Sequence, residues 1–140
     1  MVLLLDTHTW VWTVEGDARR VGRRARRLIA RAEARDEVRI SPATLFEIVA
    51  LHTSGRLHLS RLPEQWVRES LELHGVRLAE LSVAVAIDAG HIPRTALPDP
   101  LDRVLVATAR QFEATFLTAD AAILAYAARI RNVRVRNAAV

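Results

Sequence analysis

The sequence predicts a three-layer α/β domain in which helices flank a mostly parallel central sheet. Strand-like and helix-like segments alternate along the chain, and this alternation is typical of the units that build parallel sheets. The first strand-like segment, residues 2–5, is continuously apolar, as central parallel strands tend to be. The 140 residues contain no internal repeat, low-complexity tract or linker, so we expect a single domain over residues 1–140.

In the first part of the chain, helical spacing and turn residues define the elements. A short helix after the first strand is expected to end at Gly16. The next helix is amphipathic, because its apolar residues recur at helical spacing. Ser41 and Pro42 then form an N-cap and a first helical position. The expected elements are strand 2–5, helix 10–14, helix 17–35, strand 38–40 and helix 42–53.

The second part of the chain repeats this alternation, and prolines and capping residues mark where its helices begin. Pro63 begins one helix, Ser82 caps another, and Asp99 followed by Pro100 begins a third. The expected elements are helix 63–74, strand 76–81, helix 83–89, a helix from Pro100 that carries residues 104–112, strand 115–118, helix 121–129 and strand 133–136.

Composition excludes several classes of function. No apolar run approaches the roughly 20 residues of a membrane span or resembles a secretory signal, so we expect no membrane association. The absence of cysteine rules out disulfides and thiolate metal sites and fits the cytoplasm. All 20 basic residues are arginine, so Schiff-base chemistry and Walker-type phosphate loops have no candidate lysine. A net charge of +4 favours an anionic partner.

Four acidic residues lie at element ends or inside apolar segments: Asp6, Glu47, Asp102 and Asp120. A carboxylate in apolar surroundings is costly unless it is paired or binds a metal. Ligands of parallel sheets bind beyond the carboxyl ends of the strands, and the predicted elements can bring all four acids to that edge. Carboxylate oxygens suit Mg²⁺ or Mn²⁺. The pattern therefore favours one divalent-metal site.

Each acid also has a structural explanation. Asp6 and Asp120 both precede predicted helices and are equally suited to be N-caps, and Asp99 before Pro100 is better explained as a cap than as a ligand. Glu47 has the alternative of pairing with an arginine. A related ambiguity concerns the helix over 17–35, whose arginine stripe fits a solvated face better than an RNA-tracking surface. That stripe comprises Arg20, Arg24, Arg27, Arg31 and Arg35.

Four segments, taken together and in order, resemble the four conserved blocks of PIN-domain nucleases, and most closely those of VapC-type toxins of bacterial toxin–antitoxin pairs. The third block is the most specific. The chain departs from many VapC-type toxins in having Leu97-Pro98, where they carry a histidine, just before that block. The four blocks are Asp6-Thr7-His8, Ser41 to Ile48, Asp99 to Arg110 and Leu117 to Asp120.

The resemblance implies a Mg²⁺- or Mn²⁺-dependent endoribonuclease with a PIN-like fold. It assigns Asp6, Glu47, Asp102 and Asp120 to metal binding and catalysis. It further implies an RNA substrate, a cognate antitoxin protein and a homodimer. Five further residues would surround these ligands and orient the carboxylates, water or phosphate: Thr7, Ser41, Asp99, Arg103 and Thr118.

Two other functions are compatible with an α/β domain of this kind. One is a non-catalytic PIN-like RNA-binding or scaffold protein, against which the complete set of carboxylates argues. The other is an aspartyl-phosphate phosphatase. That chemistry requires Asp-x-Asp after the first strand and a downstream lysine, whereas Asp6 is followed by Thr7-His8 and the chain has no lysine.

Overall fold

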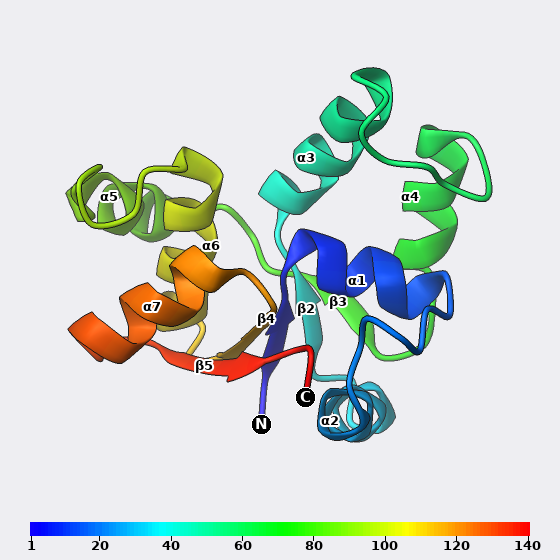
Figure 1. The fold of residues 1–140 in the computed structure, drawn as a ribbon, viewed down its shortest axis with the longest axis horizontal. Helices are drawn as coiled ribbons and strands as arrows, with labels where there is room; N and C mark the ends of the chain where they lie inside the picture. Colours follow the sequence, from blue (N-terminus) through cyan, green and yellow to red (C-terminus); the bar gives the residue numbers. More distant parts are fainter.

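A five-stranded sheet forms the centre of the protein, which we describe from a computed structural model of residues 1–140 (Figure 1). All four pairings between neighbouring strands are parallel, so the predicted parallel sheet is confirmed. The strand order is β3-β2-β1-β4-β5. The strands are β1 (Leu3–Leu5), β2 (Val38–Ile40), β3 (Val76–Leu78), β4 (Thr115–Thr118) and β5 (Arg134–Asn137).

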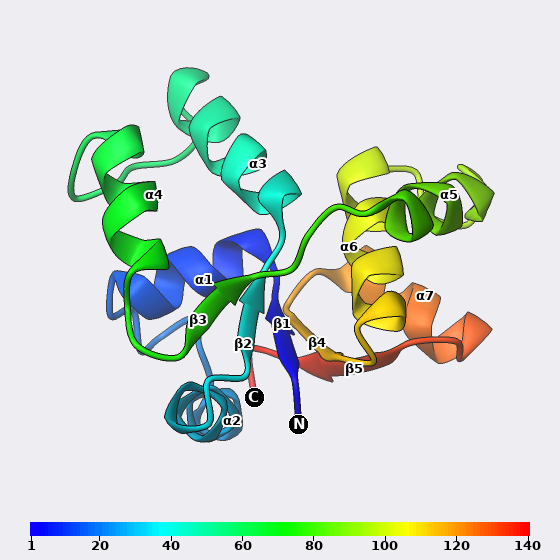
Figure 2. The same ribbon diagram turned by 180° about the vertical axis from the view of Figure 1, so that it is seen from behind.

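Helices cover both faces of this sheet and complete the predicted three layers (Figures 1 and 2). Buried residues of α1 to α4 pack on one face, and those of α6 and α7 pack on the other. No helix is long and apolar enough to cross a membrane. The helices are α1 (Thr7–Val14), α2 (Arg23–Ala34), α3 (Pro42–Thr53), α4 (Pro63–Leu71), α5 (Val83–His91), α6 (Pro100–Gln111) and α7 (Ala121–Ile130).

Strand β1 is buried on both of its faces, as its unbroken apolar sequence predicts. Leu3 and Leu5 point into the core beneath α1 and α2, whereas Leu4 points into the core beneath α6 and α7. All three side chains are almost completely inaccessible. This follows from the alternation of side chains along a strand and from the presence of a helical layer on each side.

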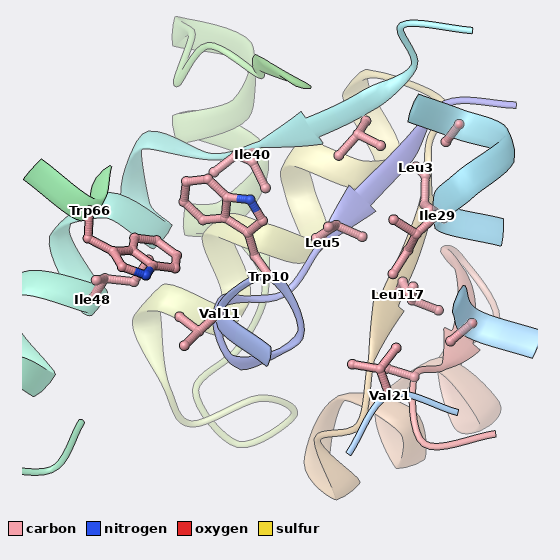
Figure 3. Packing of buried hydrophobic residues seen from close by; sticks show 14 residues of the cluster. Leu3, Leu5, Trp10, Val11, Val21, Ile29, Ile40, Ile48, Trp66 and Leu117 are labelled. Carbon is pink, nitrogen blue, oxygen red and sulfur yellow. The ribbon is translucent and has the colours of Figure 1, made fainter. Parts of the chain in front are cut away.

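Two tryptophans join α1 to α4 beside the sheet (Figure 3). The rings of Trp10 and Trp66 meet edge to face, with centroids 5.1 Å apart, and Ile48 of α3 belongs to the same core. The indole nitrogen of Trp66 donates to Glu15 Oε1 at 3.1 Å. Trp10 is therefore a core residue, and this packing fixes α3 and α4 relative to the end of β1.

The chain changes direction across the sheet at β1. From β1 it proceeds to β2 and β3 on one side and then crosses back to β4 on the other side, where Leu5 pairs with Leu117. Such a reversal leaves a crevice at the carboxyl ends of β1 and β4. This is the usual ligand position in open α/β sheets. Asp6 and Thr118 stand at these two strand ends.

Several element bounds differ from those that local sequence patterns predict. The second helix starts at Arg23 rather than near residue 17, and the first starts at Thr7, directly after its cap. Gly22 is the N-cap and has an extended backbone conformation, so the helix begins after it. Glycine is required there because a Cβ would come within 2.1 Å of the Val140 backbone. The C-terminal segment runs along this helix end, and the amide of Ala25 donates to the carbonyl of Val140 at 3.0 Å.

Candidate functional site

The candidate site begins at the carboxyl ends of β1 and β4. Asp6 directly follows β1 and caps α1, because its Oδ1 accepts a hydrogen bond from the amide of Thr7 at 2.8 Å. Its other oxygen, Oδ2, accepts from the hydroxyl of Thr118 at 2.5 Å. Thr118 is the last residue of β4 and is completely buried. The carboxylate of Asp6 is thus held between the start of α1 and the end of β4.

Thr118 also positions the second acid of this edge. Its hydroxyl oxygen accepts from the amide of Asp120 at 3.0 Å, while Asp120 Oδ1 accepts from the amide of Ile123 at 3.0 Å and caps α7. The side chain of Asp120 is exposed, and its Oδ2 makes no hydrogen bond within the chain. The capping explanations of Asp6 and Asp120 are therefore confirmed, yet each cap uses only one oxygen. The second oxygen of Asp6 accepts from Thr118, and that of Asp120 has no hydrogen bond within the chain.

Two helices bring the remaining acids. Helix α3 carries Glu47, and Ser41 starts this helix by accepting from the amide of Ala43 at 3.1 Å. Helix α6 carries Asp102 in its first turn. Both carboxylates are half-buried, and neither forms an ion pair or hydrogen bond with another residue of the chain. Glu47 does not pair with an arginine, which removes its structural alternative.

The pKa of Asp102 shows that these acids interact. Burial raises the pKa of this carboxyl from its ordinary value of 3.8 to about 8. Further negative charges contribute to the rise, namely those of Asp99, Asp120, Asp6 and Glu47. A carboxyl with such a pKa remains mostly protonated at neutral pH in the absence of a cation. Three segments that are distant in sequence, namely the end of β1, helix α3 and the β4–α7 connection, therefore act electrostatically on Asp102.

Asp6 experiences the same environment. Burial raises its pKa, the hydrogen bonds from Thr118 and Thr7 lower it, and the charges of Glu47 and Asp120 raise it again. The net direction is upward. Since like charges oppose joint ionisation, a bound divalent cation would relieve the cost of this arrangement.

The donor set fits a hard divalent cation in chemistry and charge, because it consists only of carboxylate oxygens with no sulfur or nitrogen. The side chains nevertheless do not close around one point. No group of three or more acidic or histidine side chains is near enough together to hold a metal ion. The four carboxylates thus lie along one edge of the sheet, but they are too far apart to bind one ion together.

The other candidate residues have diverse contacts. Thr7 lies behind the edge, where its hydroxyl donates to the Thr44 hydroxyl at 3.2 Å and links α1 to α3. Asp99 caps α6 by accepting from the amide of Leu101 at 2.9 Å. The guanidinium of Arg103 donates from Nη2 to the Pro98 carbonyl at 3.3 Å, and its Nε is buried without a partner.

Sequence reasoning missed Thr44 as a member of this site. This residue is completely buried and lies three positions before Glu47, on the same side of α3. A buried hydroxyl at that spacing from an acid was the available signal. Its hydrogen bond with Thr7 orients the helix that presents Glu47.

Comparison with known proteins agrees with this architecture. The family described as PIN domain matches residues 3–129. No match was found among curated proteins.

Three solved structures illustrate the similarity. A chain of VapBC2 from Rickettsia felis, bound to a promoter DNA fragment, is 16% identical with a TM-score of 0.66, and the match covers 98% of both chains. A chain of DNA-bound VapBC from Salmonella typhimurium is 21% identical with the same TM-score and the same coverage. A chain of a toxin–antitoxin complex from Klebsiella pneumoniae is 18% identical with a TM-score of 0.55, over 84% of this chain and 86% of that one. The TM-scores show that the chain shares its fold with these structures.

Proposed function

The chain belongs to the PIN domain family, and on this basis we propose that it is a divalent-metal-dependent endoribonuclease that acts as the toxin of a toxin–antitoxin pair in the cytoplasm. One observation carries the proposal. Besides burial, the charges of Asp6, Glu47 and Asp120 raise the pKa of Asp102, and the last two also raise that of Asp6, at the edge where the strand order reverses. Interacting charges at a ligand-binding edge favour a functional site over independent helix caps and ion pairs.

The residues of the chain have distinct tasks in this proposal. Asp6, Glu47, Asp102 and Asp120 would hold one or two Mg²⁺ or Mn²⁺ ions. Thr118 orients the first of these carboxylates through its hydroxyl. A bound ion of this type supplies a hydroxide nucleophile near neutral pH and neutralises charge on the scissile phosphate. Asp102 must lose its proton for this role, and the cation that it binds would drive that loss.

An antitoxin would bind across α3 and α4 in this proposal. Phe46 and Leu62 expose 67% and 74% of their surfaces there, and Val49 is also exposed. An open hollow of about 710 Å³ lies beside Val49 and Leu62. Exposed apolar residues over a hollow are suited to an extended or helical partner segment. Because Phe46 precedes Glu47, a segment seated there would also restrict access to the carboxylates.

A cleavage assay tests the proposed activity. Purified protein free of antitoxin should cleave structured RNA at few sites in Mg²⁺ or Mn²⁺, and chelation should stop the reaction. Homodimer formation can be measured on the same preparation by light scattering. Cleavage that persists in excess chelator would falsify the metal-dependent mechanism.

The separation of the carboxylates favours a second candidate, a non-catalytic RNA-binding or scaffold protein of the same fold. No three acids are close enough to hold an ion, and a PIN-like protein that has lost catalysis would have such a separated set of acids. Calorimetric titration with Mn²⁺ distinguishes the two functions. Saturable binding that Asp102→Asn abolishes supports the nuclease, whereas no binding in either protein supports the scaffold.

A further inference from the structure

A basic pocket lies on the surface away from the acidic edge. Three of its residues, Arg24, Arg27 and Arg31, come from α2, and Arg136 comes from the edge strand β5. The pocket is open and has a volume of about 480 Å³. Both ribbon views place α2 near the two chain termini, away from the first turns of α3 and α6 (Figures 1 and 2). We call it the α2–β5 pocket.

None of its four arginines has an acidic partner. The ion pairs of the chain involve other arginines, and the hydrogen bonds of arginine side chains do as well. Between Arg19 and Arg31 the sequence has seven arginines and no acid. A solvated helical face usually alternates charges of both signs. The pocket therefore concentrates positive charge that the chain itself leaves unbalanced.

The position of this charge on α2 is unfavourable for the helix alone. The first turn contains no acid, Gly22 provides no side-chain cap, and Arg23 and Arg24 stand at the end where the helix dipole disfavours cations. Arg27 and Arg31 are four positions apart, so they repel each other along one face. The oxygen of Val140 already accepts from the amide of Ala25 at this helix end, so a bound anion would chiefly relieve the repulsion among the arginines. The sequence alone favours a solvated face for this stripe, but its convergence with Arg136 from another element is better explained by binding.

We propose that the α2–β5 pocket binds the phosphate backbone of RNA at a point remote from the cleavage edge. Arg24, Arg27 and Arg31 follow one helical face over about 10 Å, which suits a polyanion better than a single small ion. Guanidinium groups bind phosphate in a bidentate manner. Ala25 and Leu28 also line the pocket, so apolar surface is available for the sugar and base beside each phosphate. This inference rests on RNA being the substrate of the proposed nuclease.

The test measures binding without cleavage. A fluorescent single-stranded RNA of about 16 nucleotides is titrated into the Asp102→Asn protein, and Kd is followed from 50 to 200 mM salt. The pocket variant adds Arg24→Gln and Arg27→Gln. The control adds Arg23→Gln and Arg26→Gln, which remove the same charge from the same turns of α2 outside the pocket. Thermal melts confirm that all proteins are folded.

The pocket variant should bind about tenfold more weakly near 100 mM salt, and the slope of log K against log salt should fall by about 1 to 2, as expected for two lost phosphate contacts. The control should change much less. Equal losses in both variants, or no loss in either, would overturn the proposal. Displacement of bound RNA by polyglutamate, with stronger pocket-dependent binding of that polypeptide than of RNA, would identify an acidic protein partner and also overturn it.

This design separates the two proposals. An active nuclease whose RNA affinity does not depend on Arg24 and Arg27 contradicts the pocket alone. A protein that never cleaves RNA, yet binds it through these arginines, contradicts the nuclease alone.

Discussion

The acidic edge and the α2–β5 pocket both gather like charges, but the chain organises them differently. The carboxylate of Asp6 is fixed by a backbone amide and a buried hydroxyl, and Asp120 is fixed by its own helix. The arginines of the pocket, such as Arg27 and Arg136, have no partner within the chain. Hydrogen bonds within the chain therefore turn a set of charges into a positioned site, whereas charges without such bonds form an adaptable surface.

The two regions should therefore respond differently to substitution. A change at the acidic edge alters the position or charge of neighbouring groups, and losses there should be large. Substitutions in the pocket remove single mobile cations, and the effects should be graded and dependent on salt.

The strongest test of this contrast is Asp102→Asn. The exchange preserves shape and has no hydrogen bond to break, yet it removes one ionisable carboxylate, and RNA cleavage should fall roughly 10³-fold or more. Initial cleavage rates in Mn²⁺ measure this effect. Asp99→Ala is the control, since it should lower the free energy of unfolding by about 0.5–2 kcal/mol through its cap while cleavage persists. Equal loss of activity in two folded variants would place both acids in the site.

Metal binding should stabilise the wild type by linkage. Free Mn²⁺ at 100 times its Kd should raise the free energy of unfolding by about 2.7 kcal/mol. Asp102→Asn should gain much less from the same ion. Thermal melts with chelator and with Mn²⁺ provide the measurement, and an equal gain in the two proteins would remove Asp102 from the ligand set.

Thr118→Val tests how far the acidic edge depends on its supporting hydroxyl. The substitution removes the donor to Asp6 and the acceptor for the amide of Asp120. The free energy of unfolding should fall by about 1–3 kcal/mol, because two part-buried groups lose their partner. Cleavage should fall about 10- to 100-fold. Thr118→Ser, which keeps the hydroxyl, should retain most of both properties, and a serine variant as impaired as the valine variant would indicate a packing role.

The pH dependence of the metal-free protein should show the raised pKa of Asp102. Its pKa in the folded state is about 8, against an ordinary value of 3.8. The folded protein retains this proton between those values, so it is stabilised below pH 4 and loses this contribution as pH rises through 8. The effect should be modest, because solvent screens this partly exposed group. Denaturant titrations in chelator from pH 5 to 9 should show a steeper decline in the free energy of unfolding for wild type than for Asp102→Asn. Parallel curves for the two proteins would contradict the raised pKa of Asp102.

The smallest expected effect concerns the basic helix. Arg23→Glu places an acid in the first turn of α2, four residues before Arg27. It should stabilise the protein by about 0.3–1 kcal/mol through the helix dipole and the new pair. Thermal melts at low salt measure the gain, which should shrink at high salt. An unchanged or lower melting temperature would show that α2 carries no unfavourable charge.

Local patterns in the sequence predicted much of the fold because capping residues act locally. Ser41, Asp99 and Asp120 cap helices where expected, and β1 is as buried as its apolar run predicted. The predicted start of α2, at residue 17, was wrong, because the helix begins at Arg23. The helical periodicity of apolar residues continues back to Val21 and therefore suggested an earlier start. The contact between Gly22 and Val140 joins residues far apart in the chain, so no local pattern could reveal it.

The candidate site was predictable for a related reason and only in part. Asp6 and Asp120 are set by strand ends and caps, so their places follow from the order of the elements. The positions of Glu47 and Asp102 relative to these two acids depend on how α3 and α6 pack over the sheet, which no local pattern specifies. The assignment of these acids as metal ligands stays a prediction. The hydrogen bond between Thr7 and Thr44 belongs to the same class of long-range detail, and it appears only when α1 and α3 pack together.

The hydrogen bond between Thr118 and Asp6 joins residues 112 positions apart. The ribosome releases the amino-terminal part first, and contacts this distant in sequence form late in folding. A nascent chain therefore contains β1 long before it contains β4, the neighbouring strand that carries Thr118. We expect a partly translated chain to hold Asp6 without its supporting hydroxyl and without Asp120. A protein proposed to cut RNA would then be harmless to its own transcript for most of the time that the transcript is being read.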